Sequence, residues 1–143
     1  MFRVFTLIII FLFVNAEKYT YASNSSKQLG SIEFSISVAG TAQTHFLHGV
    51  AALHSFWYTE ALSAFKKSIS VDPQFAMGYW GLAMTHNHPL WEEQDYKSAK
   101  AALLKINNIS KLTQREQDYI HAIRLLYGNG EKHARDKAYS KAM

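Results

Sequence analysis

The 143-residue chain contains no cysteine, so no disulfide, thiolate nucleophile or zinc–thiolate site is possible. Stability must therefore come from the packing of side chains alone. The chain also has only two prolines. Pro73 suits the first turn of a helix that follows it, and Pro89 is expected to end that helix. The two prolines thus mark the expected start and end of this helix.

The chain has no long run of charge of one sign. Its formal net charge is +4, and its lysines and arginines are scattered. Lys66 and Lys67 are interpreted as part of a solvated helix flank, which predicts that the protein does not bind nucleic acid. The acids Glu92, Glu93 and Asp95 are interpreted as solvated or capping loop residues. With no phosphate-binding glycine loop and no nucleophile elbow, the sequence predicts a non-enzyme without a cofactor.

The first residues have the layout of a secretory signal peptide. Arg3 is followed by the apolar run 4–14, which only Thr6 interrupts, and small-residue exits follow at Ala16 and Ala22. We expect a signal peptide over 1–22, cleaved after Ala16 or Ala22, and an exported protein that is periplasmic or secreted. No stable membrane span is expected after cleavage. The alternative is an uncleaved anchor helix, for which the run is short.

Residues 23–40 form the second expected region, an extended N-terminal segment. After a Ser- and Asn-rich start, apolar residues alternate with polar ones; the apolar set is Ile32, Phe34, Ile36 and Val38. Period two predicts one short strand that ends at Gly40. An isolated strand is not stable alone, so this one must pack on the first helices, pair with another chain or stay extended.

From residue 41 the chain repeats with a period of 34 residues. Ala42 aligns with Ala76, Phe46 with Trp80, and His54 with His88. Small residues at helix crossings with aromatic residues between them, at this period, are typical of stacked helical hairpins. In the first hairpin Gly49 is expected to permit close approach of the second helix, which carries Ala61 and Phe65.

Further helices are expected along the rest of the chain. A third runs from about 74 to 87, and a fourth carries Ala99, Leu103 and Ile106; four extra residues are inferred in the loop between them. The capping box Thr113–Glu116 opens a fifth. Its predicted buried stripe is Ile120, Ile123 and Tyr127. A sixth begins near Glu131 and lacks a polar cap, so we expect a truncated repeat array and possible self-association of this chain.

Five segments carry a resemblance to a known family. They are 54–61, 75–84, 88–91, 112–120 and 135–139, with the sequences HSFWYTEA, FAMGYWGLAM, HPLW, LTQREQDYI and RDKAY. The chain resembles exported bacterial tetratricopeptide repeat (TPR) proteins. The resemblance implies an all-α fold, an α-solenoid of TPR-like hairpins over 41–143, and it supplies no catalytic residues.

The inner helices of such hairpins predict a partner-binding groove. Chaperone-binding repeats hold a carboxylate with inner Lys and Asn, but here Asn87 is the only polar residue among the inner positions. The carboxylate clamp is therefore absent, and an apolar groove for a protein or peptide partner is expected instead. Its predicted residues are Phe46, Val50, Leu53, Trp80, Met84, Asn87 and His88.

Two other functions stay open from the sequence. The first is a metal-binding module built from clustered histidines, the side chains that favour Zn, Cu or Ni. Those residues are His45, His48, His54, His86 and His88, each of which is also explained by core packing or helix capping. The second is that the repeats are one arm of a larger enzyme that continues beyond Met143.

Overall fold

A computed structural model describes residues 29–143, and residues from Ser31 to Met143 form one compact unit. The predicted signal peptide over 1–22, with its two cleavage positions, lies outside the described residues. None of the helices in the described part is long and apolar enough to cross a membrane.

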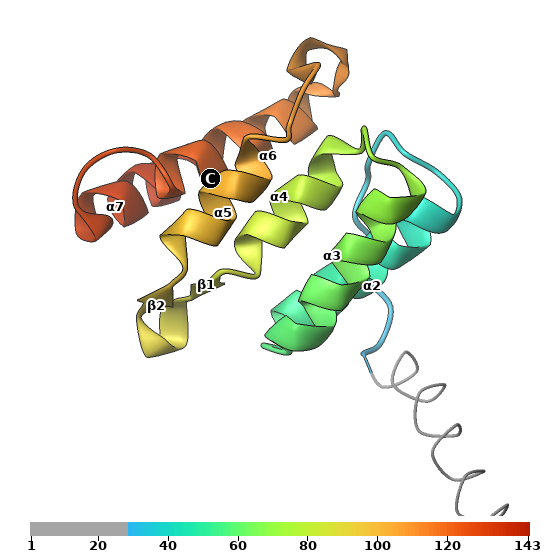
Figure 1. Ribbon diagram of the computed structural model, residues 1–143, viewed down its shortest axis with the longest axis horizontal. Helices are drawn as coiled ribbons and strands as arrows, with labels where there is room; N and C mark the ends of the chain where they lie inside the picture. Colours follow the sequence, from blue (N-terminus) through green and yellow to red (C-terminus); the bar gives the residue numbers. More distant parts are fainter. Residues whose placement is uncertain (1–28) are drawn as a thin grey trace, which may run out of the picture. The chain divides into compact units, whose positions relative to one another are not determined.

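The described residues form six α-helices and one very small sheet (Figure 1). The helices are α2 (Thr41–His54), α3 (Tyr58–Val71), α4 (Ala76–Met84), α5 (Tyr96–Leu103), α6 (Gln114–Leu126) and α7 (Lys132–Ala142). Short 3-10 turns, η1 (Pro89–Trp91) and η2 (Ile109–Lys111), lie in two of the connections. The prediction of an all-α fold is confirmed at this level.

Helix α4 is central in the packing. It contacts α2 and α3 on one side and α5 and α6 on the other, while α2 packs on α3 and α6 on α7 (Figure 1). The Tyr127 hydroxyl donates a 3.1 Å hydrogen bond to the Ala83 carbonyl and so ties the end of α6 to α4. The Ser68 hydroxyl donates to the Ala42 carbonyl and ties α3 to α2.

Phe65 explains two glycines of the core. Its ring lies between α2 and α4, fully buried. A Cβ on Gly49 would stand 2.8 Å from Phe65 Cε1, and a Cβ on Gly81 would overlap the same ring more severely. Helix propensity favours alanine over glycine by about 1 kcal/mol, so these glycines reflect packing. The expected close approach at Gly49 is confirmed, and Gly81 provides a second one.

Helix starts follow local hydrogen bonds. The predicted capping box is present, because Thr113 Oγ1 accepts from the Glu116 amide and Glu116 Oε2 accepts from the Thr113 amide. Asp95 caps α5 by accepting from the Ser98 amide. The predicted buried stripe of α6 is confirmed: Ile120, Ile123 and Tyr127 are at most 2 % exposed.

The third helix is shorter than expected. The sequence predicts a helix from about 74 to 87, whereas α4 spans Ala76–Met84. At its start the Asp72 carboxylate accepts from the Gln74 amide, which holds a turn after α3. At its end the chain enters β1 (Asn87–His88), which pairs antiparallel with β2 (Glu93–Gln94). The inferred insertion thus builds a hairpin rather than prolonging the helix.

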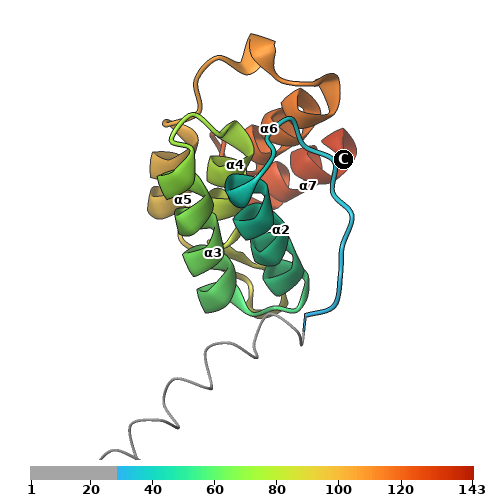
Figure 2. The same cartoon turned by 90° about the vertical axis from the view of Figure 1, so that its right-hand side faces the viewer.

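Residues 31–38, called the N-terminal segment from here on, do not form the expected strand. They are extended and lead into α2 through Gly40 at φ 73° (Figure 2). The alternation is nevertheless real: Ile32, Phe34, Ile36 and Val38 are half-buried, and the residues between them are exposed. No strand pairs with the segment because its neighbours in the described chain are helices.

Candidate functional site

Phe34 fixes the N-terminal segment to one face of the helical unit. Its ring centroid lies 5.4 Å from that of Phe46 on α2, 5.9 Å from Trp80 on α4 and 5.2 Å from Tyr119 on α6. These are favourable distances for aromatic pairs, each worth about 0.5–1.5 kcal/mol beyond area burial. The surface formed by these three helices is called the α2–α4–α6 face.

Arg115 lies over the Phe34 ring. Its guanidinium carbon lies 4.8 Å from the centroid of Phe34 and 5.6 Å from that of Tyr119. A guanidinium over an aromatic face is attracted by the ring quadrupole. Phe34 is therefore surrounded by three aromatic rings and one cation, and Trp80, Tyr119 and Arg115 come from elements distant in sequence.

Glu116 holds the backbone of the segment. Its Oε1 accepts from the Ser37 amide at 2.9 Å and from the Ser37 hydroxyl at 2.8 Å, while Oε2 serves the capping box of α6. Burial raises the pKa of the Glu116 carboxyl, but the bonds from Ser37 and Thr113 outweigh burial and hold its pKa below the usual 4.5. The buried carboxylate therefore stays ionised and links the segment to α6.

Trp80 contains an unsatisfied donor beneath the segment. The side chain is 5 % exposed and packs against Phe34, Phe46 and Tyr119. Its Nε1 is the one buried side-chain polar atom in the described chain without a hydrogen-bond partner. Such a group costs about 1–3 kcal/mol relative to a satisfied one.

The structure divides the predicted partner-binding residues into three sets. Phe46, Val50 and Trp80 are buried, and Phe46 and Trp80 meet at 6.3 Å beneath the N-terminal segment. Leu53 and Met84 are half-buried farther along α2 and α4. The last two lie in the β1–β2 hairpin, where Asn87 accepts from Gln94 and His88 bonds the Thr85 carbonyl.

The histidines are used mostly in pairs with acids or carbonyls. His48 Nε2 lies 2.8 Å from Glu60 Oε1, and His86 Nδ1 lies 4.0 Å from Asp95 Oδ2. His54 is exposed at the end of α2 and His45 is half-buried. Across residues 29–143, no three His, Asp or Glu side chains gather as a metal site.

Four contact residues of the face were not among the sequence candidates. They are Phe34, Arg115, Glu116 and Tyr119. The alternation around Phe34 and the capping box at Glu116 are visible in the sequence, but neither pattern says that the two regions meet. Only the tertiary contact between the segment and α6 identifies them.

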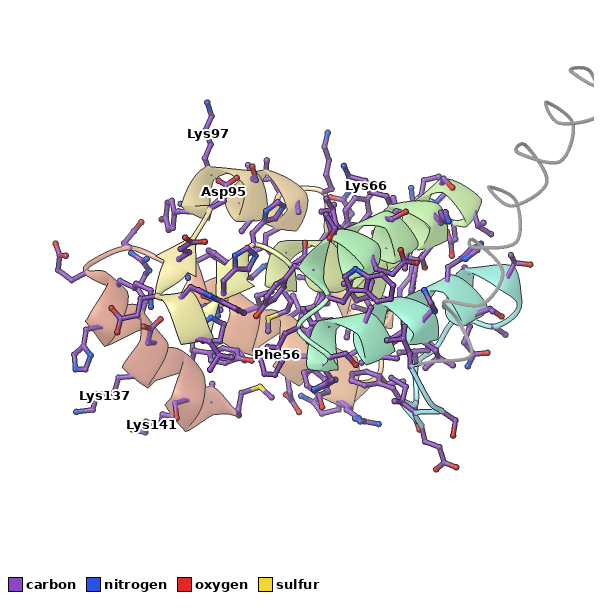
Figure 3. All side chains as sticks on the ribbon, turned by 90° about the horizontal axis from the view of Figure 1, so that it is seen from below. Phe56, Lys66, Asp95, Lys97, Lys137 and Lys141 are labelled. Atoms are coloured by element: carbon purple, nitrogen blue, oxygen red, sulfur yellow. The ribbon has the colours of Figure 1, made fainter. Side chains whose placement is uncertain are left out.

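The lysines are not confined to one surface of the unit. In Figure 3, Lys66 and Lys97 lie on one side of the unit, and Lys137 and Lys141 lie on the opposite side. Their spread matches the scattered basic residues of the sequence. On the α2–α4–α6 face, the guanidinium of Arg115 stacks on Phe34.

Comparison of the chain with protein-family models, curated proteins and solved structures finds no match. The likeness to TPR proteins therefore rests on the sequence motifs alone, and the function must be argued from the face described above.

Proposed function

We propose that this protein is an exported TPR-like scaffold that captures an extended peptide segment of another protein on its α2–α4–α6 face. The N-terminal segment is the resident occupant of that face, and the partner takes its place. Export follows from the signal-like residues 1–22, and the scaffold role from the face and its occupant.

The helical arrangement supports the TPR-like part of this proposal. The first helices of the three successive pairs, α2, α4 and α6, are in contact through α4, as stacked hairpins require. Phe65 inserts against Gly49 and Gly81 at the junction of the first two pairs. Small residues that face an aromatic ring at helix crossings are typical of stacked helical hairpins.

One observation carries the binding proposal: the face already holds an extended peptide. The N-terminal segment turns every second side chain inward, places Phe34 in an aromatic enclosure and is held at Ser37 by Glu116. An extended chain with alternate side chains in pockets is a recurring mode of peptide recognition. The face therefore supplies both an aromatic pocket and a backbone acceptor.

The unsatisfied Trp80 Nε1 favours exchange of the occupant. The resident segment leaves this buried donor without an acceptor. A partner peptide that presents a carbonyl or hydroxyl oxygen there gains a hydrogen bond that the resident segment lacks. The partner we propose is consequently an extended segment with an aromatic residue for the Phe34 position and an oxygen acceptor near Trp80.

Peptide binding to the full chain tests this function. A fluorescent peptide with the sequence of residues 30–39 is titrated against the unaltered chain and against Phe34→Ala. The variant weakens the resident segment, so we expect it to bind the peptide at least ten times more tightly than the unaltered chain. The readout is fluorescence anisotropy, with helicity checked by circular dichroism.

Two controls make this titration specific. Leu104→Ala alters an exposed apolar side chain elsewhere, so peptide affinity should stay at that of the unaltered chain. A peptide of the same composition with the alternation scrambled should not bind. Equal binding of both peptides, or no gain in Phe34→Ala with helicity retained, would reject the proposed function.

A further inference from the structure

A recess lies away from the α2–α4–α6 face, between the start of α3 and the β1–β2 hairpin. Its volume is about 530 Å³. The residues that matter for its chemistry are Tyr58, Thr85, His86, His88, Glu93 and Asp95. Of the residues predicted for the partner-binding groove, only His88 lines this recess.

Aromatic side chains line this recess and lie next to it. Tyr58 stacks on His88 with ring centroids 4.0 Å apart, and Trp91 meets both rings edge-on at 6.1 and 6.5 Å. Trp91 is 57 % exposed. An exposed indole therefore lies next to the Tyr58–His88 pair that lines the recess.

The charge around the recess is negative although the whole chain is positive. The loop from Pro89 to Asp95 contains Glu92, Glu93 and Asp95 and no lysine or arginine. Arg135 reaches the loop but donates to the Gln94 side chain and to two carbonyls of the α6–α7 turn. Lys66 is exposed on α3 and close enough to act on His86.

His88 and Glu93 present two acceptors to the same space. The Thr85 carbonyl is 3.0 Å from His88 Nε2 and only accepts, so the proton of the neutral ring is on Nε2. The Nδ1 lone pair then points to Glu93 Oε2 at 3.5 Å. Two facing acceptors call for a donor that reaches both.

His86 and Asp95 lie on the same recess. Asp95 uses Oδ1 to cap α5, and its Oδ2 lies 4.0 Å from His86 Nδ1 (Asp95 is labelled in Figure 3). Burial lowers the pKa of His86, only partly offset by Asp95, so the ring is neutral near pH 7. The Asp95 carboxylate thus adds a further acceptor beside the recess.

We propose that this recess binds a primary ammonium or guanidinium group. Such a group donates to His88 Nδ1 and the Glu93 carboxylate, with its charge near the exposed Trp91 ring next to the recess. An organic cation fits better than a metal ion, because the described residues bring no three ligating side chains together. The proposal is independent of peptide capture on the other face.

The test is an NMR titration that follows the Trp91 indole signal in the full chain, assigned by its loss in Trp91→Phe. The probes are the N-acetyl amides of lysine and arginine, with the norleucine amide as neutral control. We expect a saturable shift with both cations and none with norleucine. Glu93→Gln should weaken binding at least five-fold, and Glu131→Gln, an exposed acid on another loop, should not.

Further titrations distinguish the possible sources of the cation. Tighter binding of spermidine than of a lysine-bearing peptide assigns a free polyamine, and the reverse assigns a side chain of a partner protein. An equal shift with norleucine, or an unchanged affinity in Glu93→Gln, overturns the proposal. It is also overturned if Zn²⁺ shifts the signal and lysine amide neither binds nor competes.

Discussion

The ring of Phe34 lies 5.9 Å from that of Trp80, so one of the residues predicted for partner binding is covered by the protein's own N-terminal segment. Trp80 is 5 % exposed in this arrangement. Partner access to the face therefore requires the segment to leave, and the strength of its attachment sets the affinity for any competing peptide.

Replacing Phe34 with alanine should destabilise the fold modestly. The half-buried ring loses its contacts with Phe46 and Tyr119, which predicts a loss of about 1–3 kcal/mol in the free energy of unfolding. Phe46→Ala removes a fully buried ring and should cost about 3–5 kcal/mol. Urea denaturation measures both. Equal losses would show that Phe34 is a core residue rather than a detachable one.

Glu116 should make stability dependent on acid pH. Its pKa is lower in the folded chain than the usual 4.5, so the unfolded chain binds more protons as the pH falls. This contribution is complete above about pH 4.5 and declines as the pH falls through the folded pKa. Glu116→Gln should flatten that decline, whereas Glu131→Gln should keep it. Urea midpoints between pH 3 and 7 provide the comparison.

Two glycines of α4 form a matched pair for packing. Gly81→Ala places a methyl group into the buried Phe65 ring and should cost about 1–3 kcal/mol despite the better helix propensity of alanine. Gly78→Ala gains the same propensity but meets Cγ1 of the half-buried Ile69, and should cost less. Thermal unfolding of both variants tests this order, and a less stable Gly78→Ala would contradict the described packing.

The hydrogen bond from Tyr127 to the Ala83 carbonyl is buried and joins α6 to α4. Tyr127→Phe keeps the ring and removes the donor, so unfolding free energy should fall by about 1–2 kcal/mol. Tyr79→Phe removes a comparable bond at an exposed site and should change stability by less than about 0.5 kcal/mol. Denaturation curves showing the same small change in both would place the Tyr127 hydroxyl in solvent.

Local signals in the sequence predicted the local structure well. The capping box at Thr113 and the stripe at Ile120, Ile123 and Tyr127 depend on neighbours within a few residues, and both are present. The predicted end of the third helix was wrong. The expected stripe included His86, but the apolar side chains stop at Met84, and the chain then enters the paired strands β1 and β2.

Tertiary relations were harder to predict. The period of 34 aligns Gly49 with Ala83, yet the ring of Phe65 meets Gly49 and Gly81, because the contact depends on how the helices cross. The alternation in the N-terminal segment predicted which side chains face inward. It left open what they face, because Phe34 meets Tyr119 only after α6 has packed on α4.

The most direct test of the account is amide hydrogen exchange at Ser37, measured by NMR in the full chain and in Glu116→Ala. The Ser37 amide donates to Glu116 Oε1, whereas the adjacent segment is extended without backbone pairing in the described structure. We predict that Ser37 exchanges more slowly than its segment neighbours, that a displacing peptide abolishes this protection, and that Glu116→Ala does the same. Unprotected Ser37 in the unaltered chain would contradict occupancy of the α2–α4–α6 face by the N-terminal segment.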